Sequence, residues 1–323
     1  MTNPPVVEAE ALLGAGARRE AIALIEHAAA TNDVDALMRL ATWHLIGEPV
    51  PRDLRLARNL LARAVAIGHV DAALMEVALV ANGSGGVADW TAALGLLRVA
   101  ARNDPLAADH LALLDAMHID AQGLPLRVPA PERLSDSPDV VRYTALFTPP
   151  ECAHIAGIAA EMLEPATVLD PATGKPIAHP VRTSYGTVIG PAKESLPIRA
   201  LNHRLAAISG TSTAQGEPLA VLRYTPGQQY RPHLDSIAGA ANQRVKTVLV
   251  YLNQGFAGGE TRFLANGLTV SARAGDAIVF RNVLPDGQPD RRSEHAGLPV
   301  TQGSKWLATR WIRAAPYDPW NAA

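Results

Sequence analysis

The chain has 323 residues, of which 48% are hydrophobic, and this length favours about two domains with ordinary buried cores. Its 29 Lys and Arg residues nearly balance its 31 Asp and Glu residues, so the net charge of -2 argues against nucleic acid or an anionic membrane as a partner. The single cysteine, Cys152, excludes an internal disulfide and is expected to be a buried residue near the start of a helix.

The N-terminal segment lacks the features of a secretory signal. Residues 1–13, MTNPPVVEAEALL, contain no basic stretch followed by an apolar one. No later run of about 18 apolar residues predicts a membrane span. We therefore expect a soluble, cytoplasmic protein.

Residues 1–117 predict helices, because Ala and Leu are frequent and apolar residues recur every three or four positions. Identical residues also recur at a spacing of 36, which predicts a structural repeat. A glycine is expected to end the first helix of each unit, and an aspartate to lie near the start of the second. The matched residues are Ala36, Ala72 and Ala108, Asp35 and Asp71, Gly47 and Gly83, Asp53 and Asp89, Ala57 and Ala93, Leu60 and Leu96, Leu61 and Leu97, and Ala64 and Ala100.

This segment resembles the Sel-one-like class of tetratricopeptide-type helical repeats. The resemblance implies a concave surface that could bind a protein or peptide partner, whereas a helical domain that only packs on its neighbour is the alternative. Residues 118–135 follow, and Pro125, Pro129 and Pro131 favour extended chain there. We expect this segment to be a linker.

Residues 136–323 predict antiparallel strands after one helix. The helix is expected at 149–163, with Pro149 and Pro150 at its start and Glu151 in its first turn. Short apolar runs separated by Gly, Pro, Asn and Asp are typical of strands in a sandwich or jelly-roll barrel. These runs are Leu219–Tyr224, Val245–Leu252, Leu268–Val270, Ala277–Phe280 and Trp306–Ile312.

A His-x-Asp pair on a strand places both side chains on one side, and two histidines with one carboxylate are the ligands of non-haem iron(II) oxygenases. The sequence contains three such pairs, beginning at His69, His118 and His233. Only the third follows a predicted strand, 219–224, through a glycine turn. Its context therefore favours His233 and Asp235 as metal ligands.

Two later residues fit this site. His295 is the only histidine downstream of His233, so it is the only candidate for a further histidine ligand from a later strand. Lys305 lies ten residues beyond it and shares a strand face with Leu307, Thr309 and Trp311. A cation on an apolar face needs an anion, for which a carboxylate of 2-oxoglutarate is suitable; a surface lysine is the alternative.

Several motifs in order resemble the prolyl 4-hydroxylase-like 2-oxoglutarate/iron(II) oxygenases over about 135–323. The resemblance implies iron ligands at His233, Asp235 and His295. It implies that Lys305, Tyr224 and Thr261 bind the C5 carboxylate of 2-oxoglutarate. It also implies that Tyr230, Arg244 and Trp311 line a substrate groove. The matching segments are 224–235 (YTPGQQYRPHLD), 243–253 (QRVKTVLVYLN), 258–263 (GGETRF), 274–277 (AGDA) and 295–306.

The resemblance thus implies an α+β multidomain chain. A helical repeat domain (1–117) and a linker (118–135) precede a double-stranded β-helix, or jelly-roll, oxygenase domain (136–323). The implied activity is hydroxylation with Fe(2+), 2-oxoglutarate and O2, with ascorbate as a further cofactor. The expected product is a hydroxylated prolyl residue in a peptide or protein, with succinate and CO2.

Three alternatives stay open. The substrate could instead be a free amino acid or small metabolite, because fold and metal do not fix the substrate. The chain could be a non-catalytic protein that interacts through its repeats. Zinc could also bind the same three residues, although a zinc site does not require Lys305. Halogenating relatives lack the carboxylate ligand, so the presence of Asp235 favours hydroxylation.

Overall fold

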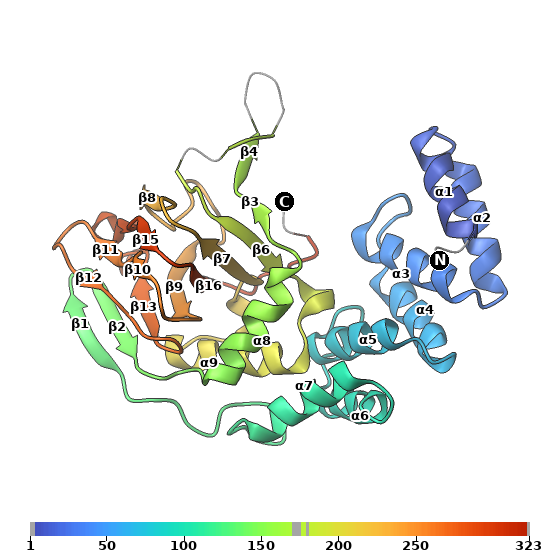
Figure 1. Ribbon diagram of the computed structural model, residues 1–323, viewed down its shortest axis with the longest axis horizontal. Coiled ribbons are helices and arrows are strands. Elements are labelled where there is room, and N and C mark those ends of the chain that lie inside the picture. Colours follow the sequence, from blue (N-terminus) through green and yellow to red (C-terminus); the bar gives the residue numbers. More distant parts are fainter. Residues whose placement is uncertain (1–3, 170–175, 179–180, 322–323) are drawn as a thin grey trace. The chain divides into compact units, whose positions relative to one another are not determined.

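The computed structural model describes residues 4–169, 176–178 and 181–321 and divides into two compact units (Figure 1). One unit comprises Met1–Met117 with Ala121–Gly123 and Pro191–Arg199, and the other comprises the remaining residues. Among the described residues, no helix has the length and apolar character needed to cross a membrane.

The first unit is a series of helices in which each packs against the next along the chain. The first helix of one predicted unit begins at Val34 and that of the next at Val70, and the second helices begin at Leu54 and Trp90. The predicted repeat is therefore present in the structure. The helices are α1 (Pro4–Gly14), α2 (Arg18–Ala30), α3 (Val34–Ile46), α4 (Leu54–Ala66), α5 (Val70–Asn82), α6 (Trp90–Ala100) and α7 (Pro105–Ala116).

The repeated glycines and aspartates have the predicted roles. Gly47 and Gly83 end α3 and α5 with left-handed φ angles of 89° and 80°, which glycine adopts without steric cost. Asp53 and Asp89 cap α4 and α6, because each side chain accepts a hydrogen bond from the backbone N–H three residues later, at 2.9 and 2.8 Å. The burial of the matched residues repeats less well, because Leu60 is buried and Leu96, its counterpart 36 residues later, is 36% exposed.

The two other His-x-Asp pairs have local structural roles. His69 precedes α5, and its Nδ1 accepts the N–H of Ala72 at 3.2 Å. The Asp120 side chain accepts the N–H of Leu124 at 2.9 Å within a turn. The first strand begins at Glu132, so the segment predicted as a linker contains ordered structure at both ends.

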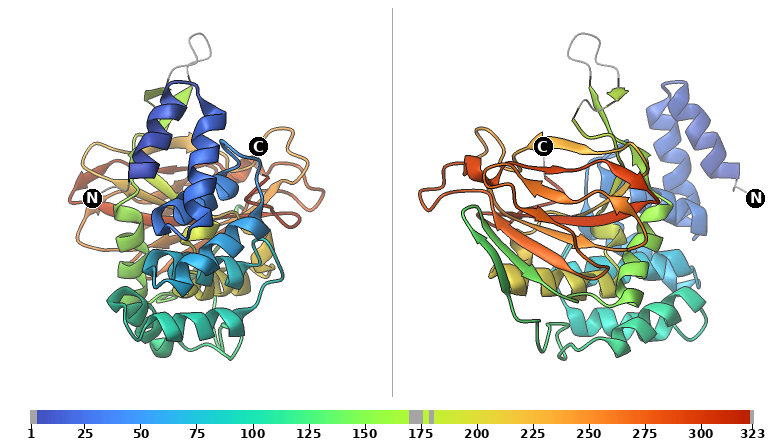
Figure 2. Two further views of the ribbon diagram at one scale, coloured as in Figure 1. Left: turned by 90° about the vertical axis from the view of Figure 1, so that its right-hand side faces the viewer. Right: turned by 60° about the vertical axis from the view of Figure 1, so that its left-hand side comes forward.

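The second unit contains two facing antiparallel sheets. The chain passes repeatedly from one to the other: β7, β9, β13 and β16 lie in the large sheet, and β8, β11, β12 and β14 lie in the small one (Figures 1 and 2). This alternation is the double-stranded β-helix that the sequence predicts. The large sheet, in order, is β1 (Glu132–Asp136), β2 (Asp139–Tyr143), β13 (Ala277–Arg281), β9 (Arg244–Tyr251), β16 (Lys305–Arg313), β7 (Leu219–Tyr224), β6 (Tyr185–Ile189) and β3 (Glu164–Pro165).

The small sheet carries the strands that bear the histidines. The described chain also contains two short strand pairs and three 3₁₀ turns, at Pro191–Lys193, Thr213–Gln215 and Arg291–Ser293. The small sheet, in order, is β12 (Thr269–Val270), β11 (Thr261–Phe263), β14 (His295–Gly297) and β8 (Tyr230–His233); the pairs are β10 (Ala257–Gly258) with β15 (Val300–Gln302) and β4 (Thr167–Leu169) with β5 (Pro176–Ala178).

The helix α8 (Pro149–Ala160) begins where the sequence predicts and ends three residues earlier. Thr148 and Glu151 form a reciprocal cap at its N-terminus, and Cys152 is 1% exposed, as expected. The helix packs against β6 and β7. A second helix, α9 (Leu196–Ser209), supplies Arg204, which forms a buried ion pair with Glu151 at 2.9 Å.

The core of the second unit lies between the two sheets. The five predicted strands agree with β7, β9, β12, β13 and β16 to within one residue at every end. The core does not fill the whole space between the sheets, because a pocket lined partly by polar residues also lies there. Its buried members are Val140, Leu249, Tyr251, Phe263, Val270, Ile278, Phe280 and Leu307.

Candidate metal centre

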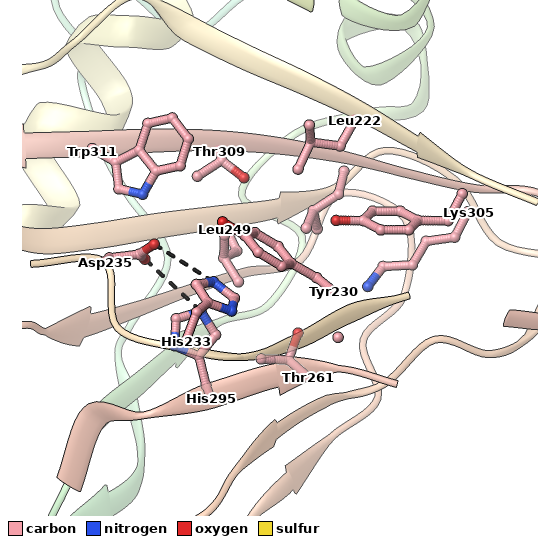
Figure 3. A pocket seen from close by; sticks show the side chains of 13 residues that line it. Leu222, Tyr230, His233, Asp235, Leu249, Thr261, His295, Lys305, Thr309 and Trp311 are labelled. Atoms are coloured by element: carbon pink, nitrogen blue, oxygen red, sulfur yellow. Dashed lines mark ion pairs between the residues drawn. The ribbon is translucent and has the colours of Figure 1, made fainter. Parts of the chain in front are cut away.

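Two adjacent strands of the small sheet bring the predicted ligands together. His233 ends β8, His295 begins β14, and the two residues are direct cross-strand partners. Asp235 follows β8, and its Oδ1 and Oδ2 lie 3.7 and 3.8 Å from the Nε2 atoms of His233 and His295. One ligand atom from each residue lies within 4.8 Å of the others (Figure 3). All three side chains therefore point at one position.

A tight turn positions the first histidine. The strand β7 ends at Tyr224, and Gly227 in the following turn has a φ of +86°, a conformation that side chains other than glycine rarely adopt. The N–H of Gly227 donates to the carbonyl of Val300 at 2.8 Å. The chain then enters β8 at Tyr230 and reaches the site three residues later.

Backbone carbonyls fix the tautomer of both histidines. Nδ1 of His233 lies 2.8 Å from the carbonyl oxygen of Arg231, and Nδ1 of His295 lies 3.0 Å from that of Ser293. Because a carbonyl only accepts hydrogen bonds, each Nδ1 carries the proton and each Nε2 presents its lone pair. Burial and the nearby His295 lower the pKa of His233 to about 4, which keeps this ring in the neutral form that metals bind.

The carboxylate of Asp235 is 5% exposed. Burial alone would raise the pKa of Asp235, but the two imidazoles and a hydrogen bond from Thr247 outweigh burial and lower it. The Thr247 hydroxyl donates to Oδ2 at 2.6 Å, and the indole N–H of Trp311 points toward the carboxylate (Figure 3). Two neutral imidazoles and one carboxylate fit a divalent first-row metal with positions left open for other ligands.

A pocket extends from these three residues between the two sheets (Figure 3). Of the nine residues predicted for the site, Arg244 is absent from its lining and the other eight line it. The apolar residues Leu222, Leu249 and Leu307 lie among the polar ones in this lining. The lining residues in the described part of the chain are Leu222, Tyr224, Tyr230, His233, Asp235, Leu249, Thr261, His295, Gly297, Lys305, Leu307, Thr309 and Trp311.

Lys305 lies at the inner end of the pocket and is 2% exposed. Its Nζ donates to the carbonyl of Gly259 at 2.6 Å and lies 5.5 and 5.1 Å from the ring centres of Tyr224 and Tyr251. Burial lowers the pKa of Lys305 to about 8, although Glu260 opposes this effect. Within the described residues, no carboxylate oxygen lies within 4.0 Å of this amine. The amine thus has the surroundings of an anion site.

Two other polar groups border the same space. The hydroxyl of Thr309 is buried and, within the described residues, has no hydrogen-bond partner. The hydroxyl of Thr261 lies 2.7 Å from that of Tyr251. Between the three-residue cluster and Lys305, the pocket therefore offers polar groups that a small bound dicarboxylate would satisfy.

The remaining predicted residues are Tyr230, Trp311 and Arg244. The ring of Tyr230 stacks on that of His233, with centres 3.5 Å apart and planes 11° apart. The guanidinium of Arg244 instead pairs with Glu217 at 2.6 and 2.8 Å and covers the ring of Trp311 at 4.0 Å. Arg244 was expected to line a groove, and it lies behind Trp311 rather than in the pocket wall.

Sequence reasoning did not identify Thr247 or Asn282. Thr247 lies within the matched segment 243–253, directly before the apolar run 248–252, and this position is the signal that could have revealed it. Asn282 follows β13 and donates to Thr247 Oγ1 at 2.9 Å. No local pattern indicates this contact, because 35 residues separate the two.

Comparison with known proteins gives consistent matches. The family model described as the 2OG-Fe(II) oxygenase superfamily matches residues 219–313. The chain is 38% identical over 213 residues to prolyl 4-hydroxylase 1 of Arabidopsis thaliana, an alignment that covers 60% of this chain and 75% of the relative.

Two solved structures resemble separate parts of the chain. The 2OG complex of the viral collagen prolyl hydroxylase from Paramecium bursaria Chlorella virus-1 is 26% identical and covers 56% of this chain and 99% of that one, with a TM-score of 0.45. The Sel1 repeat protein from Oxalobacter formigenes is 22% identical and covers 33% of this chain and 85% of that one, with a TM-score of 0.30.

Proposed function

Because the chain belongs to the prolyl 4-hydroxylase family of 2-oxoglutarate- and iron(II)-dependent oxygenases, we propose that it hydroxylates a prolyl residue in a peptide or protein. The observation that carries this proposal is one pocket with a two-histidine, one-aspartate cluster at one end and a buried lysine at the other. The overall reaction consumes dioxygen and 2-oxoglutarate, releases succinate and CO2, and converts one C–H bond into C–OH.

His233, Asp235 and His295 are the proposed iron ligands. The two Nε2 lone pairs and the ionised carboxylate supply three donors, and a six-coordinate metal then keeps three positions for other ligands. When bound there, iron(II) supplies the redox chemistry that couples decarboxylation of 2-oxoglutarate to oxygenation of the substrate. Retention of the carboxylate ligand favours hydroxylation over halogenation.

Lys305, Tyr224 and Thr261 are the proposed site for the C5 carboxylate of 2-oxoglutarate. Lys305 and Tyr224 are direct cross-strand partners on β16 and β7, and both are buried. A carboxylate at this end would supply the anion that the buried ammonium lacks, and the two hydroxyls can donate to the same group. The keto acid end would then face the metal ligands.

The substrate is proposed to approach from the side of Tyr230 and Trp311. The two aromatic rings border the metal cluster, and Arg244 holds the indole from behind through stacking. Aromatic surfaces of this kind suit the ring of a prolyl residue in extended chain. A free amino acid or small metabolite would use less of this surface and remains the second candidate class.

The helical repeats are proposed to bind a peptide or protein partner. Large apolar side chains are exposed on this unit, among them Ile46 at 59% and Val99 at 56%. Ascorbate is proposed as an accessory reductant. No nucleic-acid partner is expected.

The direct test is succinate formation from 2-oxoglutarate with iron(II), ascorbate and a pool of proline-containing peptides. We expect peptide-dependent succinate and a mass gain of one oxygen on a prolyl residue. His118→Ala is the matched control for replacement of a proposed histidine ligand, because His118 belongs to another His-x-Asp pair and is exposed. The proposal fails if no peptide supports turnover and the iron-loaded protein does not bind 2-oxoglutarate.

A further inference from the structure

The carboxylate of Asp235 is the end of a chain of buried hydrogen bonds. Its Oδ2 accepts from Thr247 Oγ1 at 2.6 Å, and Thr247 Oγ1 lies 2.9 Å from Nδ2 of Asn282. Thr247 and Asn282 are both 0% exposed. These two residues reach the proposed metal site from the large sheet, whereas the histidines reach it from the small sheet.

The chemistry of the groups sets the direction of this chain. An ionised carboxylate only accepts, so the single proton of the Thr247 hydroxyl is donated to Asp235. The hydroxyl oxygen must then accept from its other neighbour, and the amide nitrogen of Asn282 only donates. Each bond polarises the next, so the amide strengthens the bond that Thr247 makes to the carboxylate.

The backbone fixes Asn282 in this position. Its N–H donates to the carbonyl of Val245 at 3.0 Å, and its carbonyl accepts from the N–H of Asp290 at 2.9 Å. Thr247 is held by strand pairing with Phe280. Within the described residues, Oδ1 of the Asn282 side chain has no hydrogen-bond partner. A buried amide with one unsatisfied end is costly, and core packing alone does not explain it.

We propose that Thr247 and Asn282 are positioning residues that make Asp235 a ligand through one oxygen. The bond to Oδ2 occupies that oxygen and restrains rotation of the carboxylate, which leaves Oδ1 to bind the metal. A carboxylate that bound through both oxygens would use one more coordination position. Thr247 and Asn282 therefore preserve a position for the reactants. This inference rests on the proposed iron site.

The test is a titration of the full-length, metal-free protein with cobalt(II), whose visible absorption depends on coordination number. Thr247→Val keeps the side-chain shape but removes the hydroxyl, and we expect cobalt affinity to fall about 10- to 100-fold with an altered spectrum. Thr247→Ser keeps the hydroxyl and should retain most of the affinity and the wild-type spectrum. Circular dichroism establishes that each variant is folded.

The second residue is tested by a double-mutant cycle. Asn282→Ala alone should reduce cobalt affinity by less than about tenfold, because it only weakens the bond that Thr247 makes. In the Thr247→Val background the same substitution should have no further effect on affinity. Independent losses that multiply would show that Asn282 does not act through Thr247.

The outcomes separate this inference from the proposed function. If the wild-type protein binds no cobalt, the proposed metal site is wrong. If the wild-type protein binds cobalt and Thr247→Val has the same affinity and spectrum, the metal site stands and the positioning role is wrong. Failure of Thr247→Ser to restore a spectrum lost in Thr247→Val also overturns the positioning role.

Discussion

Replacement of Lys305 by Met should stabilise the ligand-free protein and weaken 2-oxoglutarate binding at the same time. Lys305→Met removes the charge of a side chain that is 2% exposed and keeps a similar length and volume. A buried charge without a partner lowers stability, but the same charge is what attracts a carboxylate. The two effects therefore have opposite signs.

The effect on stability follows from the pKa of Lys305. Burial lowers this pKa from 10.5 to about 8, and each pKa unit corresponds to about 1.4 kcal/mol, so the buried charge costs about 3 kcal/mol at pH 7. The penalty is complete below the folded pKa and disappears as pH rises through the unfolded value. Loss of the hydrogen bond to the carbonyl of Gly259 offsets about 1 kcal/mol. The expected net gain in the free energy of unfolding is about 2 kcal/mol.

The effect on binding is larger. Removal of one partner of a buried ion pair costs about 3–5 kcal/mol, so the dissociation constant for 2-oxoglutarate should rise more than about 100-fold. Urea denaturation of the metal-free protein measures stability, and oxygen-free calorimetric titration of the iron-loaded protein measures affinity. Lys193→Met, at an exposed lysine, is the matched control and should change neither quantity. Unchanged affinity for 2-oxoglutarate, or a fall in stability, would refute the reasoning.

Three further predictions concern the same pocket. Lys305 has a pKa of about 8 and is charged below that pH, so the affinity for 2-oxoglutarate should fall about tenfold per pH unit above pH 8. The affinity of Lys305→Arg should stay constant over the same range, and calorimetric titration at a series of pH values tests both expectations. His295→Ala should abolish iron-dependent succinate formation, and retained turnover would remove His295 from the proposed ligands. Arg244→Ala should raise the KM for peptide about tenfold and leave the KM for 2-oxoglutarate unchanged, because Arg244 covers Trp311 and does not line the pocket itself; equal changes in both constants would contradict this.

The sequence predicts the parts of this chain that depend on local signals. Gly47 and Asp53 end and begin helices because their conformations and side chains suit those positions in any context. The limits of the strands follow from short apolar runs. The inward direction of Lys305 follows from the alternation of side chains along β16. The ordered motifs predicted the prolyl 4-hydroxylase family, and the comparisons confirm it.

The parts that sequence could not predict depend on contacts between distant residues. Arg244 belongs to a matched motif, but its orientation is set by Glu217, which lies 27 residues earlier in the loop before β7. Asn282 reaches Thr247 only because β13 and β9 are paired. A polar residue beside a strand can have several structural roles, and its role depends on which strands pair in the folded sheet.

The cross-strand pairing of His233 with His295 has a consequence for assembly. A shift of one residue between β8 and β14 would send one imidazole to the opposite face of the small sheet, so a metal can be held only when this register is correct. Iron that binds the correctly paired sheet stabilises it by mass action, and substitutions that loosen the pairing far from the ligands should weaken iron binding. Formation of the small sheet and uptake of the metal are therefore coupled equilibria.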